Sequence, residues 1–169
     1  MSSKEREKWH RHMGVYGICL NTKQELLVIK KNGGPYTGFY DLPGGSMEES
    51  ESLQEALIRE MVEETGYNVK IEKCLGCFDF LINSEYNGCP FTQHIGVFYI
   101  VSLADRVSEK IERIIINQTA FDENDSLGVE WIKLSDINLM NSSPLVEKTK
   151  KLLNGIVKFG LEEYTDWVR

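Results

Sequence analysis

The sequence predicts one domain built on a mixed β-sheet, with helices packed on its faces. β-rich runs precede and follow one amphipathic helix, and a second helix follows the last of these runs. A chain of 169 residues is also long enough to bury one core without disulfides or metal staples. We expect a polar segment at 1–12, the main domain at 13–140 and a helical extension at 141–169.

Three short runs before the helix account for the first part of the sheet. The runs 13–20 and 25–30 are rich in β-branched and apolar residues, and a polar, turn-like stretch separates them. A loop containing glycine and proline leads to a third run at 39–42, which ends at Pro43-Gly44-Gly45. The pattern predicts two strands with a short connection, then a loop and a short strand.

The central helix is predicted over residues 51–65. Ser50 or Ser52 is placed to cap it, and acidic residues occupy its first turn. Gly66 stands where a left-handed residue would end it. Apolar residues at helical spacing predict its buried side: Leu53, Ala56, Leu57 and Met61.

The remaining elements follow the helix. Runs at 69–82 and 91–103 flank Asn87-Gly88, a strong hairpin signal, although the connection looks longer than two residues. Residues 104–120 fit a helix or a strand equally well. A last strand is predicted at 128–134. Two further predictions concern the C-terminal part: Ser142-Ser143-Pro144 opens a helix, and the final 161–169 either packs back on the domain or joins a partner.

Composition limits the classes of function. The net charge of −7 and the lack of a basic patch argue against binding duplex nucleic acid through its phosphates. No apolar run approaches the roughly 18 residues of a membrane span, and the charged N-terminus lacks the apolar core of a signal peptide. We therefore expect a cytoplasmic protein, in which a divalent cation neutralises any anionic substrate.

Cysteine spacing suggests a zinc site that we weigh and do not favour. Cys74-x-x-Cys77 is followed by Cys89 and His94. The region is predicted to be a strand, where positions 74 and 77 would point to opposite faces. Reduced, packed thiols are the simpler expectation for a cytosolic chain.

Three glutamates in the second half of the central helix indicate a cation site. Successive helical residues are about 100° apart, so Glu60 and Glu64 lie within about 20° of Leu53, on the buried side, and Glu63 about 80° away. Carboxylates this close raise one another's pKa unless a cation neutralises them. Oxygen ligands suit Mg²⁺ or Mn²⁺, whereas the alternative is an ordinary solvated helix face.

Flanking residues extend this interpretation. Arg59 is positioned to pair with Glu51, either as an ordinary surface ion pair or as a brace that orients the ligands, and we favour the brace. Gly44 and Gly45 just before the helix either make a simple turn or let the backbone approach a metal or phosphate closely.

These residues carry a family resemblance. The pattern Gly45-x5-Glu51-x7-Arg59-Glu60-x2-Glu63-Glu64-x-Gly66 resembles the Nudix box, the signature of the Nudix hydrolases. Flanking sequence extends the similarity over roughly 13–139, and one position departs, because Tyr67 replaces the usual aliphatic residue.

The resemblance implies a fold, a reaction and roles for residues. The fold is an α/β/α sandwich, and the reaction is Mg²⁺-dependent hydrolysis of a nucleoside diphosphate linked to another group. Glu60, Glu63 and Glu64 would hold the metal, Gly45 would offer backbone contact, and Glu51 with Arg59 would brace the site. Family members take the general base from the box or from a later acidic loop, for which the candidates here are Asp122, Glu123, Asp125 and Glu130.

The substrate itself is left open. Phe39, Tyr40, Phe80 and Phe91 are candidates to stack on a base, although core packing is the simpler interpretation of each. His94 either touches a phosphate or makes an ordinary hydrogen bond, which we favour. We expect a small nucleotide as partner and a homodimer as one possible assembly.

Two other functions compete. The first is a binding module that senses a nucleotide without cleaving it, although such modules usually lose box glutamates and this chain keeps them all. The second is a prenyl diphosphate isomerase, which would need a reactive cysteine such as Cys19 or Cys74. Nothing near either cysteine supports it.

Overall fold

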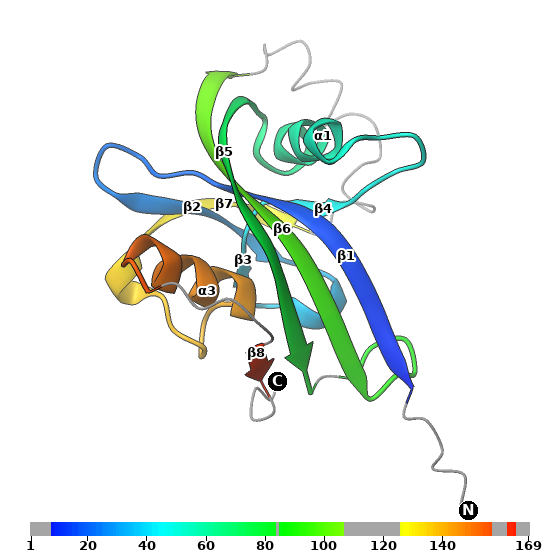
Figure 1. The fold of residues 1–169 in the computed structure, drawn as a ribbon. Helices are drawn as coiled ribbons and strands as arrows, with labels where there is room; N and C mark the ends of the chain where they lie inside the picture. Colours follow the sequence, from blue (N-terminus) through cyan, green and yellow to red (C-terminus); the bar gives the residue numbers. More distant parts are fainter. Residues whose placement is uncertain (1–7, 84, 107–125, 157–161, 165–169) are drawn as a thin grey trace, which may run out of the picture.

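The computed structural model describes residues 8–83, 85–106, 126–156 and 162–164 (Figure 1). A five-stranded sheet has the order β4-β1-β6-β5-β8, and a three-stranded sheet has the order β3-β2-β7. The strands are β1 (Trp9–Ile18), β2 (Glu25–Lys31), β3 (Tyr40–Asp41), β4 (Gly44–Ser46), β5 (Tyr67–Ile82), β6 (Phe91–Arg106), β7 (Ser126–Lys133) and β8 (Glu162–Tyr164). The helices are α1 (Leu53–Thr65) and α3 (Pro144–Leu153), with 3₁₀ turns η1 (Gly34–Tyr36) and η2 (Leu134–Asp136).

The two faces of the sheets bury two separate cores. Strand alternation sends Tyr16 and Ile18 of β1 into one core, together with Leu145 of α3. Val15 of β1 points into the other core, together with Leu57 of α1. Figure 1 shows α1 and α3 on different sides of the strands. The fold is therefore mixed α and β, as predicted, with a helix against each face.

The helix α1 begins two residues later than predicted because Ser52 caps it. The Ser52 hydroxyl accepts from the Glu55 backbone amide, and the Glu55 carboxylate accepts from the Ser52 amide. Gly66 ends the helix in the left-handed conformation, with φ of 72°. Ala56, Leu57 and Met61 are buried as predicted. Leu53, at the first turn, is only partly buried.

Strands β1 and β6 are longer than the sequence suggested. β1 starts at Trp9 rather than at residue 13, because residues 9–12 pair in parallel with 91–94 of β6. β6 continues through 104–106, and the rest of the ambiguous stretch lies outside the described residues. Between β5 and β6, Asn87 and Gly88 form a two-residue turn with φ of 52° and 71° inside a longer connection.

Register shifts in β5 correct the cysteine geometry. A shift between Cys74 and Gly76 leaves Cys74 opposite Tyr99 and Cys77 opposite Val97. Because Tyr99 and Val97 share one face of β6, both cysteines point to that same face rather than to opposite ones. Both are exposed, so the expectation of packed thiols is wrong for them, whereas Cys19 is buried and Cys89 is partly buried.

Helix α3 and strand β8 pack back on the domain. The Ser143 hydroxyl caps α3 by accepting from the Val146 amide at 3.3 Å. β8 pairs in parallel with the end of β5. The Lys148 ammonium, which is almost completely buried, donates to Glu162 of β8 at 2.5 Å. The predicted helix start is confirmed, and residues 162–164 add a strand to the larger sheet.

Candidate active site

The short strand β4 brings the glycine loop against the C-terminal half of α1. β4 pairs antiparallel with β1, which places Gly44 opposite Tyr16 and Gly45 opposite Val15. Gly44 has φ of 142°, and a Cβ there would stand 2.1 Å from the Val15 carbonyl oxygen. Only glycine fits this position, and the close approach leaves the Gly44 amide free to donate to Glu64 Oε2 at 2.8 Å.

Glu64 is the most buried of the three glutamates, with 6% of its side chain exposed. Burial raises the pKa of its carboxyl group to about 8, although Lys31 and the Gly44 amide act in the opposite direction. The Lys31 ammonium lies 3.7 Å from Glu64 Oε1. A carboxylate held in this position needs positive charge nearby to be ionised at neutral pH.

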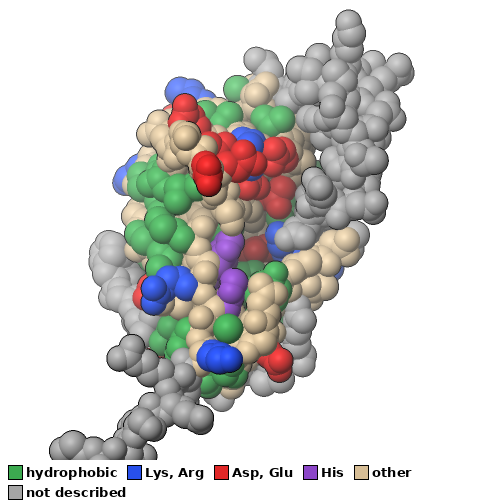
Figure 2. All heavy atoms as spheres, turned by 90° about the vertical axis from the view of Figure 1, so that its right-hand side faces the viewer, with side chains coloured by type: hydrophobic (Ala, Val, Ile, Leu, Met, Phe, Trp, Pro, Cys, Tyr) green, Lys and Arg blue, Asp and Glu red, His purple; other side chains and the backbone are tan. Residues whose placement is uncertain are grey.

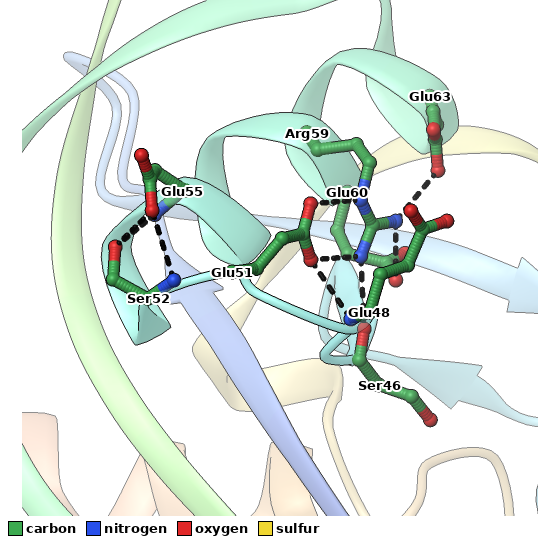
Figure 3. A network of polar contacts seen from close by, with 8 residues as sticks. All are labelled: Ser46, Glu48, Glu51, Ser52, Glu55, Arg59, Glu60 and Glu63. Atoms are coloured by element: carbon green, nitrogen blue, oxygen red, sulfur yellow. Dashed lines mark hydrogen bonds and ion pairs between the residues drawn. The ribbon is translucent and has the colours of Figure 1, made fainter.

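Arg59 joins the loop to the helix (Figure 3). Its Nε and Nη2 donate to the two Glu51 carboxylate oxygens at 2.7 and 2.9 Å, and Nη2 also donates to the Ser46 carbonyl at 2.9 Å. The hydrogen bonds from Arg59, together with one from the Glu48 amide, lower the pKa of Glu51 to about 2. The predicted pair is therefore confirmed as a bidentate contact, which fixes the guanidinium plane.

The same guanidinium also reaches the other two glutamates. Arg59 Nη1 donates to Glu60 at 2.9 Å and to Glu63 at 3.1 Å. The Glu60 side chain is 14% exposed and the Glu63 side chain 52% exposed, so the predicted order of burial holds. Burial raises the pKa of Glu60, with Arg59 opposing the shift. Arg59 thus holds two carboxylates of its own helix, Glu60 and Glu63, together with Glu51 from the preceding loop.

The donor set fits a hard divalent cation. Glu60, Glu63 and Glu64 supply only oxygen, and the buried Glu64 needs a cation to be ionised. Within the described residues, no group of three acidic, histidine or cysteine side chains already stands in a metal-binding arrangement. The reason is local, since Arg59 engages Glu60 and Glu63 while Glu64 faces Lys31. Binding a cation would require these carboxylates to turn away from Arg59.

Gly45 controls the position of Glu60. A Cβ at Gly45 would stand 2.7 to 2.9 Å from the carboxylate atoms of Glu60, which can move aside because they end a flexible side chain. We expect Gly45→Ala to leave the thermal unfolding midpoint nearly unchanged and to lower metal affinity by about 10- to 100-fold. Isothermal titration calorimetry with MnCl₂ measures that loss. Ser46→Ala, which keeps the carbonyl used by Arg59, is the control, and equal affinity in the two variants would contradict the prediction.

Two residues at the site were not predicted from the sequence. Lys31 ends β2 and acts on the titration of Glu60, Glu64 and Asp41. Asp41 is 3% exposed, and burial raises its pKa to about 6. Its carboxylate accepts from the Ser143 hydroxyl at 2.6 Å, across 102 residues of sequence. Lys31 could have been suspected as a cation at the end of an apolar strand, but no local signal pointed to Asp41.

The predicted base-stacking residues lie in different places. Phe80 is buried in the core. Phe39 packs against that core, and Phe91 stacks on Trp9. Tyr40 is partly buried, and its hydroxyl donates to the exposed Glu130 at 2.8 Å. The candidate bases Asp122, Glu123 and Asp125 lie outside the described residues.

Figure 2 shows the acidic side chains gathered on one face, above a hollow in which histidine side chains are exposed. Fold and site together define a mixed α and β protein with a cluster of carboxylates on one helix. The chain belongs to the NUDIX domain family, whose model matches residues 10–154. No helix in the described part of the chain is long and apolar enough to span a membrane.

Individual relatives share the region around the box. An ADP-ribose pyrophosphatase of Methanocaldococcus jannaschii is 37% identical over 75 residues, 44% of this chain and 44% of that protein. A Bacillus subtilis protein provisionally named 8-oxo-dGTP diphosphatase is 40% identical over 65 residues, 38% and 42% of the two chains. The chain thus spans less than half the length of these relatives. A solved UDP-X diphosphatase shares the fold, with a TM-score of 0.59, 19% identity and coverage of 94% and 71%.

Proposed function

We propose that the protein is a metal-dependent pyrophosphohydrolase. Its substrate would be a nucleoside diphosphate linked to another group, which water cleaves by attack on a phosphorus atom. The observation that carries the proposal is the convergence of Glu60, Glu63 and the buried Glu64 beside the backbone of Gly44 and Gly45. An acidic protein with this site is suited to polyphosphate only when cations neutralise the phosphates.

The residues divide the work. Glu60, Glu63, Glu64 and the Gly45 carbonyl would hold Mg²⁺, or Mn²⁺ in its place. When bound, the cation supplies charge that polarises the phosphoryl oxygens and neutralises developing negative charge. Glu51 anchors Arg59. Arg59 can then keep its hydrogen bonds to Glu51 while Glu60 and Glu63 turn toward the cation. Lys31 adds a fixed positive charge on the β2 side of the site.

The attacking water needs a general base within reach. The Glu63 side chain is 52% exposed, so its carboxylate is accessible to water, and Arg59 donates to it at 3.1 Å. Glu130 is also exposed, but its carboxylate is engaged by Tyr40. We therefore favour a box glutamate, with the acidic segment containing Glu123 as the alternative source.

One assay tests the function. We expect ADP-ribose, nucleotide sugars, nucleoside triphosphates and dinucleoside polyphosphates to be cleaved to different extents with MgCl₂ and not with EDTA. Products are identified by ion-exchange chromatography. The names of the relatives place ADP-ribose and oxidised deoxynucleoside triphosphates first in the panel. Tight nucleotide binding without product formation, with Mg²⁺ or with Mn²⁺, would contradict hydrolysis and favour a sensing module.

A further inference from the structure

A short segment between β3 and β4, residues 42–43, carries the chain from one sheet to the other. We name it the crossing segment, because β3 belongs to the three-stranded sheet and β4 to the five-stranded sheet. The Pro43 carbonyl accepts from the Gly17 amide at 2.9 Å, and the Gly44 amide donates to Glu64 at 2.8 Å. The far end of the crossing segment is therefore fixed to β1 and to the most buried of the three glutamates.

The near end of the crossing segment is fixed by the residues that lead into α3. The Tyr40 amide donates to the Asn141 carbonyl at 2.8 Å, and the Tyr40 carbonyl accepts from the Ser143 amide at 2.8 Å. Tyr40 also forms a parallel bridge with Ser142, so β3 has β2 on one side and residues 141–143 on the other. Figure 1 shows β3 next to α3. The chain before α3 therefore takes the place of a neighbouring strand on this side of β3.

One side-chain contact ties the start of α3 to the crossing segment itself. Asp41 Oδ1 accepts from the Ser143 hydroxyl at 2.6 Å and from the Leu42 backbone amide at 2.9 Å. Asp41 is 3% exposed and Ser143 is completely buried, so bulk water does not compete for the bond between them. A hydrogen bond from a hydroxyl to a carboxylate is short and roughly twice as strong as one between neutral groups. A single carboxylate oxygen thus connects α3 to the first residue of the crossing segment.

The buried carboxylate of Asp41 has positive charge on two sides. Ser143 is the cap of α3, and the N-terminal end of a helix carries a partial positive charge. Asp41 is paired with Ile29 of β2, and Lys31 follows Ile29 on the same face, so Lys31 is a diagonal neighbour within reach of Asp41. The Lys31 ammonium also lies 3.7 Å from Glu64. Asp41 is therefore next to the glutamate site, with Lys31 as their common neighbour.

We propose that Ser143 and Asp41 are positioning residues of the active site, through which the start of α3 sets the place of the Gly44 amide and so of the Glu64 carboxylate. The path runs from the Ser143 hydroxyl to Asp41, from Asp41 to the Leu42 amide, and along the crossing segment to Gly44 and Glu64. This inference rests on the proposed function, which makes Glu64 a metal ligand. It gives α3 a role in the site, since the helix then supports the glycine loop from the side opposite α1.

Two substitutions at one position separate this role from helix capping. Ser143→Gly and Ser143→Ala both remove the hydroxyl that donates to Asp41, but glycine is nearly as good a cap as serine, whereas alanine is much poorer. Circular dichroism is therefore expected to show a larger fall of the thermal unfolding midpoint in Ser143→Ala than in Ser143→Gly. Ser142→Ala is the matched control, because the Ser142 hydroxyl is equally buried and donates to Asn141 rather than to Asp41.

The first measurement needs neither metal nor catalysis. In ¹H–¹⁵N correlation spectra of the full chain without metal, the Leu42 and Gly44 amide resonances are expected to move in Ser143→Gly and Ser143→Ala and to stay in place in Ser142→Ala. Both amides donate hydrogen bonds, whose geometry changes once Ser143 no longer holds Asp41. A Gly44 resonance that stays in place, whether or not Leu42 moves, would overturn the inference, because the contact would then be purely local.

Metal affinity gives the second measurement. Isothermal titration calorimetry with MnCl₂ is expected to show a loss of about ten-fold in Ser143→Gly and Ser143→Ala alike, the order of one hydrogen bond to a charged group. Ser142→Ala should keep the wild-type affinity. A loss in Ser143→Ala alone would follow the cap rather than the hydroxyl and would overturn the inference while leaving the proposed hydrolysis standing. A wild-type chain that binds no MnCl₂ sinks the proposed function instead, and the amide spectra still decide whether α3 holds the loop.

Discussion

Glu64→Gln is expected to lower Mg²⁺-dependent kcat/KM by at least about a hundred-fold, the upper end of the loss found when a group that supports a metal ligand is removed. The carboxamide keeps the size of the side chain and can still accept from the Gly44 amide. It cannot carry negative charge, so it loses its value as a ligand to a hard cation. Turnover at saturating MgCl₂ with the best substrate of the panel measures the effect.

The same substitution is expected to have a different effect on stability. The pKa of Glu64 is raised from 4.5 to about 8, so the folded protein binds this proton more tightly than the unfolded chain does. Its stabilising contribution is complete below pH 4.5 and is lost as pH rises through 8. In EDTA, Tm of the wild type should therefore fall between pH 4.5 and about 8 more steeply than Tm of Glu64→Gln, by the linkage relation.

Together, the two measurements separate a lost ligand from a damaged fold. Glu63→Gln is the matched control, because it makes the same chemical change on the same helix at a side chain that is 52% exposed rather than buried. A double variant, Glu63→Gln with Glu64→Gln, that keeps full Mg²⁺-dependent turnover would contradict the assignment of the metal site.

Sequence periodicity was sufficient to predict the central helix and the directions in which its carboxylates point. The spacing of Glu60 and Glu64 from Leu53 follows from the 3.6-residue repeat, and it correctly placed Glu60 and Glu64 inward and Glu63 to the side. The pairing of Arg59 with Glu51 was also predicted. Such contacts involve residues close together in the sequence, where local geometry fixes which side chains meet.

Other parts of the site depend on contacts between distant strands. Asp41 meets Ser143, and His94 meets Tyr16 and Tyr36, through pairing across 58 to 102 residues that no local pattern encodes. The extension of β1 to Trp9 likewise requires β6 as its partner. The two exposed cysteines of β5 were misplaced because a register shift reverses the alternation expected of a regular strand.

Metal binding is expected to release nearly one proton per cation at pH 6.5. With a pKa of about 8, Glu64 is protonated in the metal-free protein at that pH, and a carboxyl group must lose its proton to coordinate a cation. As the pH is raised toward 8, the apparent affinity for Mg²⁺ or Mn²⁺ should consequently increase about ten-fold per pH unit. Above about pH 9 it should become constant. The Glu64 carboxylate also faces Lys31, Glu60 and Asp41. Because the pKa of Asp41 is about 6, metal binding should release a further, smaller fraction of a proton from Asp41 below that pH.

Calorimetric titrations of the EDTA-treated, desalted protein in buffers with different ionisation enthalpies count the released protons directly. Glu64→Gln should abolish the dependence of the observed heat on the buffer, and Glu63→Gln should preserve it. A wild-type heat that is the same in every buffer at pH 6.5 would mean that Glu64 is already ionised or does not bind the cation. Because coordination by Glu64 requires its full deprotonation, a release close to one proton that disappears in Glu64→Gln distinguishes coordination by Glu64 from a cation held by Glu60 and Glu63 alone.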